Sequence, residues 1–199
     1  MSNNNKNPLE NEQDLISRLK EGQQEAYRHL VRRYQSKLVN IAYGITLDRE
    51  ESLDIVQDVF LKVYQNIRSF KEKSKLITWL RRITINESLN WRRKWKRRFR
   101  WQHDSIENGE IDKSAELSTV EFGPEMIYRK KELEKILNQG LNKLTEDARA
   151  VLILKESEGL SYDEIAEIMG INKGTVSSRL FYAREELKKS LLKIMDKED

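Results

Sequence analysis

The sequence predicts an all-α protein made of two small helical domains joined by a flexible acidic linker. Apolar residues recur at three- and four-residue steps through residues 12–101 and again from about residue 126, the spacing that gathers them on one face of a helix. The chain has only two prolines and eight glycines, and few runs alternate apolar and polar residues. Between the helical stretches, residues 102–125 hold seven acidic residues and a single lysine, which is typical of a linker; an acidic binding segment is the alternative.

The composition restricts the kind of protein. Hydrophobic residues make up 38% of the chain and charged residues 35%, enough for two small cores but not for one large core. There is no cysteine and there are only two histidines, so disulfides and cysteine-based zinc sites are excluded and a histidine metal cluster is not expected. Residues 1–11 predict a flexible tail without the apolar core of a signal peptide, and no stretch approaches about 18 uninterrupted apolar residues. We therefore expect a cytoplasmic protein with no cofactor and no membrane insertion.

The N-terminal domain, residues 12–101, is expected to be helical nearly throughout. Asp48 begins one of its helices, and Glu51, three residues later, completes an acidic variant of a capping box. The segment SFKEKSKLIT, residues 69–78, breaks the helical pattern and is interpreted as a loop, with the next helix starting near Thr78.

The C-terminal domain, residues 126–199, carries a predicted helix-turn-helix. Ser161 and Glu164 form a capping box, Gly170 stands where a left-handed residue ends the first helix, and Asn172 caps the second. The second helix of such a unit enters the major groove of DNA, whereas an ordinary helical hairpin would share the same caps. A preceding helix that starts after Thr145 favours a compact four-helix domain that reads DNA. Side chains of the second helix that the core does not need can donate to phosphates and base edges: Lys173, Thr175, Ser177, Ser178, Arg179, Tyr182 and Arg184.

Two further features suggest partners. Residues 91–100 read WRRKWKRRFR, with seven basic residues and with Trp91, Trp95 and Phe99 spaced four apart on one helical face. Such a helix can lie along phosphates; a solvated helix end and a membrane-surface helix are the alternatives. The helix over residues 49–65 instead carries an acidic, partly apolar side, which indicates a protein contact or a merely solvated face.

These features, in this order, resemble the sigma factors of bacterial RNA polymerase, most closely the compact extracytoplasmic-function (group 4) type of the sigma-70 family. Residues 48–67, DREESLDIVQDVFLKVYQNI, look like region 2.2. Residues 77–95, ITWLRRITINESLNWRRKW, look like regions 2.3 and 2.4. Residues 160–187, LSYDEIAEIMGINKGTVSSRLFYAREEL, look like region 4.2. Three long motifs in the right order are far more specific than any one of them.

The resemblance implies roles for individual residues. The surface for the clamp helices of the polymerase's largest subunit would comprise Asp54, Gln57, Asp58 and Leu61, and the polymerase flap is a second implied contact. The loop of residues 69–78 would receive a base flipped out of the minus-ten element, while Trp79 would be a core residue. The implied minus-ten contacts are Ser69, Phe70, Lys73, Lys75, Thr78, Asn86, Arg92 and Arg93.

For the minus-thirty-five element, the resemblance implies that Ser177, Ser178, Phe181 and Tyr182 face the DNA. Lys173 and Thr175 would extend this surface, whereas Arg179 and Arg184 are interpreted as phosphate-binding or helix-packing residues. The chain departs from the family pattern at a few positions, and these departures concern promoter sequence rather than protein class: Asn90, Leu76, Ser177 and Tyr182.

The resulting hypothesis is a non-enzymatic alternative sigma factor. It would bind core RNA polymerase, read two promoter elements, trap melted DNA, and thread its acidic linker toward the RNA exit path. Such sigma factors are commonly held by an anti-sigma factor, which makes one a candidate partner. One rival is a stand-alone helix-turn-helix regulator, which would bind an operator without polymerase. The other is an enzyme acting on nucleic acid, which metal-dependent nuclease activity would reveal.

Overall fold

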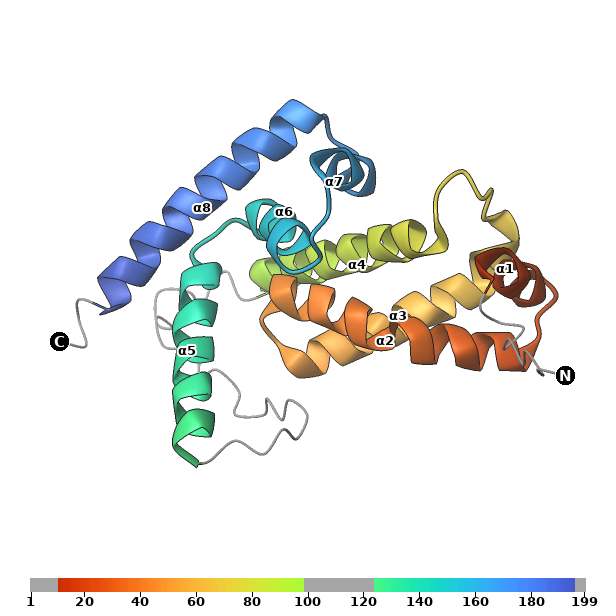
Figure 1. The fold of residues 1–199 in the computed structure, drawn as a ribbon, viewed down its shortest axis with the longest axis horizontal. Coiled ribbons are helices and arrows are strands. Elements are labelled where there is room, and N and C mark those ends of the chain that lie inside the picture. The colour runs from red at the N-terminus through yellow and green to blue at the C-terminus, as the bar shows by residue number, and fades with distance from the viewer. Residues whose placement is uncertain (1–10, 99–123, 196–199) are drawn as a thin grey trace, which may run out of the picture.

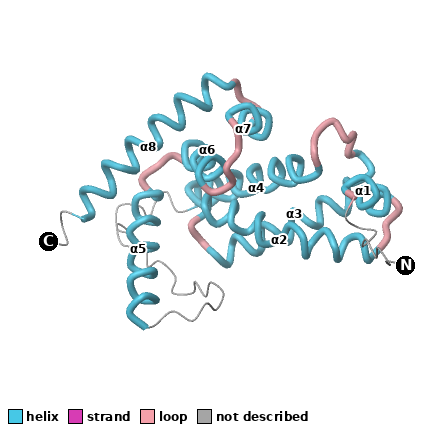
Figure 2. Tube along the Cα trace, viewed as in Figure 1, coloured by secondary structure: helices cyan, strands magenta, loops and turns pink. Residues whose placement is uncertain are grey.

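The computed structural model describes residues 11–98 and 124–195, and within these ranges the chain is helical with no strand (Figures 1 and 2). The all-α prediction is confirmed. The N-terminal half holds α1 (Glu12–Lys20), α2 (Gln24–Thr46), α3 (Arg49–Asn66), a short 3-10 turn (Ile67–Ser69) and α4 (Leu76–Arg98). The C-terminal half holds α5 (Pro124–Asn142), α6 (Glu146–Glu156), α7 (Tyr162–Met169) and α8 (Lys173–Met195).

Short-range capping sets where several helices begin. The Asp48 side chain accepts a hydrogen bond from the Glu51 backbone N–H (3.0 Å) at the start of α3, and the Thr145 hydroxyl accepts one from the Ala148 N–H (3.3 Å) at the start of α6. Each bond satisfies one of the N–H groups that a first helical turn leaves without a partner. The predicted helix starts at Asp48 and Thr145 are therefore confirmed. The capping box expected at Asp48 is only half formed, because the Asp48 N–H donates to the Thr46 hydroxyl (3.2 Å) rather than to the Glu51 carboxylate.

Two predicted boundaries were wrong. The loop expected over residues 69–78 is shorter, because Ser69 ends the 3-10 turn and α4 already begins at Leu76. The Leu76 N–H donates to the Glu12 carboxylate (3.1 Å), so the acid that caps α4 comes from α1, 64 residues earlier. In addition, α5 begins at Pro124, inside the expected linker, because proline is well tolerated in a first helical turn. Residues 1–10 and 99–123, where the tail, Phe99 and most of the linker fall, lie outside the described residues.

The first hydrophobic core belongs to the N-terminal half alone. Helices α2, α3 and α4 lie side by side, and α1 packs across one end of them (Figure 1). Completely buried side chains fill the space between these four helices, among them Leu15, Leu30, Leu38, Val59 and Leu80. This core holds α3 and α4 in fixed positions, so their outward faces form rigid surfaces.

The second hydrophobic core is shared by the two halves of the chain. It contains residues of α6, α7 and α8 such as Leu154, Ile165 and Leu180, together with residues of the N-terminal half. The contributions of that half are Ile41 and Ile45 of α2 and Ile85 and Leu89 of α4. Figure 1 shows the cause: α6 and α7 lie against α4, while α5 and α8 frame one end of the bundle. The C-terminal four-helix unit is thus docked onto the N-terminal bundle.

A search of the described helices for a membrane-spanning segment found none that is long and apolar enough.

Candidate nucleic-acid and protein interfaces

The predicted helix-turn-helix is present over α7, a short turn and the start of α8. The Ser161 N–H donates to the Glu164 carboxylate (2.9 Å) and the Glu164 N–H donates to the Ser161 hydroxyl (3.2 Å), which completes the capping box. The hydrogen bond from the Ser161 backbone lowers the pKa of Glu164. Gly170 ends α7 with φ of 66°, and the Asn172 side chain accepts from the Thr175 N–H (2.7 Å) to start α8. Each element of the predicted motif is confirmed.

The first turns of α8 present a bare face with two aromatic rings. Ser177 and Ser178 are exposed, and Phe181 and Tyr182 expose 61% and 69% of their surface. Their rings meet edge-on with centroids 5.5 Å apart. Folding alone does not explain two large exposed aromatic side chains side by side, so they indicate a binding surface.

Three cations of α8 pair with acids of neighbouring helices. Lys173 pairs with Asp163 of α7 (2.8 Å), and Arg179 lies 3.4 Å from a carboxylate oxygen of Asp147 in α6. Arg184 donates to Glu156, also of α6, with its Nε 3.0 Å from the carboxylate. The helix-packing interpretation of Arg179 and Arg184 therefore agrees with the structure. Because exposed ion pairs contribute about 0–1 kcal/mol, DNA phosphates can compete for these side chains.

The outer face of α3 is also bare, and it is larger than the sequence indicated. Asp54, Gln57 and Asp58 are exposed, and Leu61 exposes 59% of its surface. Two neighbours on the same helix, Leu53 and Tyr64, are exposed as well, and sequence reasoning did not include them. The residues alternate at three- and four-residue steps, so acidic and apolar groups share one stripe. A stripe of this composition is suited to a protein partner rather than to DNA.

The loop before α4 contains exposed residues that can contact a partner and one residue that belongs to the hydrophobic core. Lys73 and Lys75 are exposed, Thr78 is half-buried, and the Ser69 hydroxyl donates to the Asn66 carbonyl (2.7 Å). Phe70 is a correction to the expected minus-ten contacts, because it is only 6% exposed and stacks on Trp79 with ring centroids 4.9 Å apart. Burial of the Phe70 ring against the first core removes its apolar surface from water, which stabilises the fold. Trp79 packs against the same core, as expected.

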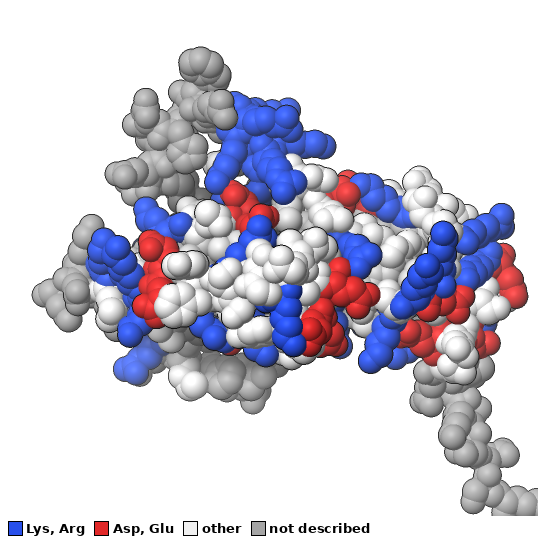
Figure 3. Space-filling model, turned by 90° about the horizontal axis from the view of Figure 1, so that it is seen from above, with Lys and Arg blue, Asp and Glu red and all other residues white. Residues whose placement is uncertain are grey.

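The basic end of α4 is exposed except at one arginine. Figure 3 shows a dense group of Lys and Arg side chains on one face of the molecule. Arg93 is exposed in this segment, as is Asn86 two turns earlier. Arg92 is a second correction, because it is 8% exposed and donates to the Thr46 carbonyl (3.4 Å) and the Asn142 side chain (3.2 Å). Burial lowers the pKa of its guanidinium, and in this conformation protein groups occupy the side chain that was expected to bind DNA.

Between the two halves lie polar contacts that sequence reasoning missed. Arg149 of α6 is completely buried and donates to the carbonyls of Ile45 (2.7 Å) and Leu144 (3.3 Å). Burial and the neighbouring charge of Arg92 lower the pKa of Arg149 to about 10. Arg81 of α4 pairs with Glu158, which follows α6, and both side chains are nearly covered. No local pattern marks these residues, because their partners in the other half of the molecule are 77 to 104 residues away in the chain.

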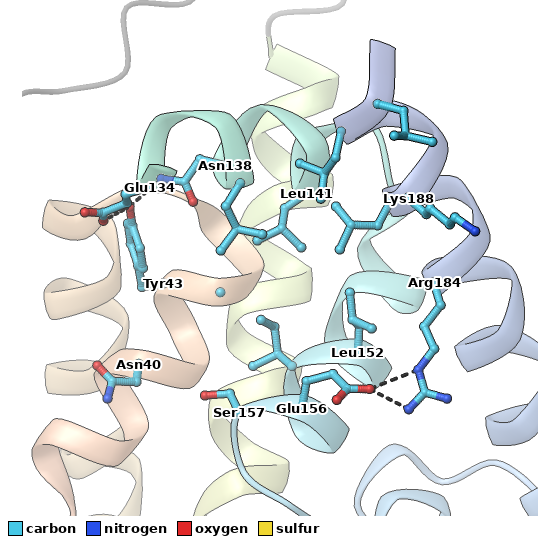
Figure 4. Close-up of a pocket in the computed structure, with 16 residues that line it drawn as sticks. Asn40, Tyr43, Glu134, Asn138, Leu141, Leu152, Glu156, Ser157, Arg184 and Lys188 are labelled. Carbon is cyan, nitrogen blue, oxygen red and sulfur yellow. Dashed lines mark hydrogen bonds and ion pairs between the residues drawn. The ribbon is translucent and has the colours of Figure 1, made fainter. Parts of the chain in front are cut away.

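A groove of about 850 Å³ opens between α2, α5, α6 and α8 (Figure 4). Its apolar lining includes Leu141 and Leu152, and polar groups lie at its rim. At one side the Asn138 amide donates to the Tyr43 hydroxyl (2.7 Å), which in turn donates to the Glu134 carboxylate (3.1 Å). The groove has walls from both halves of the chain, so its shape depends on their being docked.

A search for metal sites found no group of three or more His, Cys, Asp or Glu side chains able to hold an ion in residues 11–98 and 124–195.

Comparison with known proteins places two family regions on the chain. The model of sigma-70 region 2 matches residues 30–98, and the model of sigma-70 region 4 matches residues 134–187. The ECF RNA polymerase sigma-E factor of Haemophilus influenzae is 36% identical over 185 residues, covering 92% of this chain and 97% of that protein. The RNA polymerase sigma-H factor of Pseudomonas aeruginosa is 36% identical over 183 residues, covering 92% and 94%.

Two solved structures share the arrangement of helices. The sigma factor RpoE in complex with the anti-sigma factor NepR from Bartonella quintana has a TM-score of 0.64 and 26% identity, covering 84% of this chain and 97% of that one. CnrH in complex with the cytosolic domain of CnrY has a TM-score of 0.63 and 21% identity, covering 94% and 99%. At that identity the CnrH likeness shows the fold alone.

Proposed function

The chain belongs to the extracytoplasmic-function sigma factors of the sigma-70 family and directs promoter-specific transcription initiation, and from this premise we propose which of its residues make each contact. In this proposal region 2 lies within residues 12–101 and region 4 within residues 124–199, since α5 begins at Pro124, and the acidic linker lies between them. The chain works as a non-catalytic factor in the cytoplasm, where its polymerase acts.

The outer face of α3 binds the clamp helices of the polymerase's largest subunit. Two observations support this contact: the face combines acidic and apolar side chains, and these side chains are exposed. Asp54, Asp58 and Leu61 project from a helix that the first core holds in place. Neither carboxylate forms an ion pair with another side chain in the described part of the chain. Leu53 and Tyr64 extend this contact. Exposed leucines between the acids supply the apolar centre that protein interfaces require.

The loop before α4 and the outer side of α4 bind the melted minus-ten element. Exposed cations and polar groups there can hold a single strand by its phosphates while an extruded base enters the loop. Phe70 is left out of this set because it belongs to the core, and Arg92 joins it only where region 4 has moved away. The residues proposed for the contact are Ser69, Lys73, Lys75, Thr78, Asn86 and Arg93.

The start of α8 reads the minus-thirty-five element. Ser177 and Ser178 reach base edges, and the rings of Phe181 and Tyr182 contact thymine methyl groups or sugars. Lys173, Thr175, Arg179 and Arg184 flank them and hold phosphates when DNA displaces their present partners. Region 4 also contacts the polymerase flap. An anti-sigma factor is a further partner, since the related RpoE was solved in complex with one.

The observation that carries the proposal is the order of the two family regions, each with a bare face. The deciding experiment adds the chain to bacterial core polymerase and measures transcripts from a library of promoter fragments. We expect transcripts from a small promoter set with core polymerase, and only weak DNA binding without it. Tight, palindrome-specific binding in the absence of polymerase would instead support a stand-alone regulator.

A further inference from the structure

The basic residues of α8 fall into two groups that differ in their partners. Each basic residue in the first half of the helix pairs with a carboxylate of α6 or α7: Lys173 with Asp163, Arg179 with Asp147 and Arg184 with Glu156. The lysines of the second half form no ion pair in residues 11–98 and 124–195: Lys188, Lys189 and Lys193. Pairing is therefore confined to the part of α8 that belongs to the helix-turn-helix.

The paired residues flank an uncharged surface of α8. We call this surface the reading face; its residues are Ser177, Ser178, Phe181 and Tyr182. At about 100° of turn per residue, Lys173 and Arg184 fall on one side of the reading face and Arg179 on the other. We call these three residues the flanking cations. Because the reading face holds no charge, every ionic contact between this part of α8 and DNA depends on the flanking cations.

Helix dipoles account for two of the three carboxylates but not for the third. Asp147 and Asp163 lie in the first turns of α6 and α7, where the helix dipole stabilises a negative charge. Glu156 is the last residue of α6, where the same dipole disfavours an acid. Its carboxylate accepts a hydrogen bond from Nε of Arg184 (3.0 Å), and this bond raises the pKa of Arg184. The cation that Glu156 holds therefore accounts for its position.

A cation that is already paired adds little to sequence-independent DNA binding. Such binding arises where Lys and Arg side chains neutralise phosphates and release the counterions condensed on DNA. To contact a phosphate, a flanking cation must leave its carboxylate, which then stays near the negatively charged backbone. Exposed ion pairs are weak, so each one lowers the affinity by at most about fivefold, but three of them act on one helix. The carboxylates thus lower the affinity for every sequence and leave the reading face unchanged.

We propose that Asp147, Glu156 and Asp163 set how stringently the minus-thirty-five element is selected. They hold the flanking cations away from phosphates, so that a promoter is bound only where the reading face also makes good base contacts. The proposal rests on the proposed function.

The effect on selection follows from promoter occupancy. At a concentration that half-fills a matched promoter, a promoter bound tenfold more weakly is about one-tenth filled. If both affinities rose tenfold, the two promoters would be about nine-tenths and about one-half filled. The preference for the matched promoter would fall from about fivefold to about twofold, although the ratio of the two affinities is unchanged.

Neutralising the three carboxylates tests the proposal. The full chain with Asp147→Asn, Glu156→Gln and Asp163→Asn is titrated with a labelled DNA duplex of random sequence at several salt concentrations. We expect binding about tenfold tighter than that of the wild type at about 0.1 M salt. The plot of log affinity against log salt should be steeper by about two to three, because each freed cation releases about one more counterion. In single-site variants, Asp147→Glu keeps the charge beside Arg179 and should bind like the wild type, whereas Asp147→Asn should bind more tightly.

A matched control removes three negative charges where no ion pair is lost. Its substitutions lie at exposed positions that form no ion pair in the described part of the chain: Glu21→Gln, Glu132→Gln and Glu186→Gln. The control should change the affinity by less than about twofold and leave its salt dependence unchanged, because salt screens distant charges. Equal tightening in both triple variants would assign the effect to net charge and overturn the proposal. An unchanged salt dependence in the first variant would overturn it as well.

The same variants are assayed with core polymerase on two promoters that differ only in the minus-thirty-five element. The preference for the better element should fall by about twofold or more when the three carboxylates are neutralised, and it should persist in the control. An unchanged preference would overturn the role in selection. Each single substitution is measured too, so the test survives if the triple variant does not fold. Absence of promoter-directed transcription by the wild-type chain would instead count against the proposed function, on which binding of the random duplex does not depend.

Discussion

Two faces of region 2 differ in exposure: one is open to solvent, and the other is covered by region 4. The outer face of α3 is bare, although it exposes Leu61 and Tyr64. The face formed by α2 and α4 is covered by region 4, which buries Ile45 and Ile85 and supplies Arg149 as a cap. Both faces carry apolar side chains, so hydrophobicity alone does not separate a surface that stays exposed from one that is covered within the chain. Shape and polar complementarity to region 4, present only on the covered face, make the difference.

The largest effect is expected at the covered face. Arg149→Ala removes the donor to the Ile45 and Leu144 carbonyls and leaves a cavity, which should lower the free energy of unfolding by about 3–5 kcal/mol. Arg149→Lys keeps the charge but not the two-pronged geometry and should cost less. Urea denaturation followed by circular dichroism measures both. An Arg149→Ala protein as stable as wild type would show that these hydrogen bonds contribute little to the free energy of unfolding.

At the bare face, a binding effect without a stability effect is expected. Asp54→Lys with Asp58→Lys reverses the charge of exposed side chains and should weaken binding to core polymerase by at least about 2 kcal/mol, measured by competition with a labelled sigma factor. The thermal midpoint should stay within a degree or two of wild type because no packed group is removed. Glu21→Lys with Glu25→Lys makes the same charge change elsewhere on region 2. If the control variant loses as much affinity for core polymerase, the change in net charge alone explains the effect.

The bare face of α8 should show a smaller, sequence-dependent effect. Tyr182→Ala removes a 69% exposed ring and should cost about 1–2 kcal/mol in binding to the minus-thirty-five element, seen in footprints of the polymerase complex. Lys189→Ala, an exposed change further along α8, is the control. If Tyr182→Ala weakens binding equally for all DNA sequences, Tyr182 contacts DNA without contributing to sequence recognition.

The capping box should contribute about 1 kcal/mol. Ser161→Ala removes the hydroxyl that accepts from the Glu164 N–H, and it leaves an N–H at the start of α7 unsatisfied. Thermal unfolding of the full chain measures the loss. Ser178→Ala, at an exposed position in the second turn of α8, should by contrast be nearly neutral for stability. If the thermal midpoint of Ser161→Ala equals that of the wild type, the cap does not stabilise the helix-turn-helix.

The smallest effect concerns pH. Burial alone would raise the pKa of Glu146, but the hydrogen bond from Lys96 and the nearby positive charges outweigh it, so the pKa lies below its ordinary value. A depressed pKa means that the stability contribution of Glu146 is present above the ordinary carboxyl pKa and is lost as the pH falls through the lowered value. Because Lys96 is in α4 and Glu146 in α6, acidification should weaken the contact between these two helices, by less than about 1 kcal/mol. Glu146→Gln should flatten the dependence of the thermal midpoint on pH below the ordinary carboxyl pKa, and a curve parallel to that of the wild type would contradict this role of Glu146.

Local signals predicted a large part of this molecule correctly. The caps at Asp48, Thr145 and Ser161 and the left-handed stop at Gly170 each depend on residues within four positions of one another, so the sequence displays them directly. The exposed residues of α3 and α8 followed from helical periodicity together with the family resemblance. The start of α4 was missed because its cap, Glu12, comes from another helix.

Phe70, Arg92 and Arg149 mark where local reasoning ends. By residue type and spacing, Phe70 and Arg92 fit a DNA-binding segment. Arg149 looks like an ordinary basic residue of a helix. Their environments come from Trp79, from the end of α2 and from the docking of region 4, and three of these contacts cross 46 to 104 residues of chain. Periodicity, caps and motif order, which act over one or two helical turns, therefore established the all-α class, the two regions and their bare faces. The shared core and the polar contacts between the two halves arise only when distant helices meet, because burial and hydrogen-bond partners are properties of the packed chain.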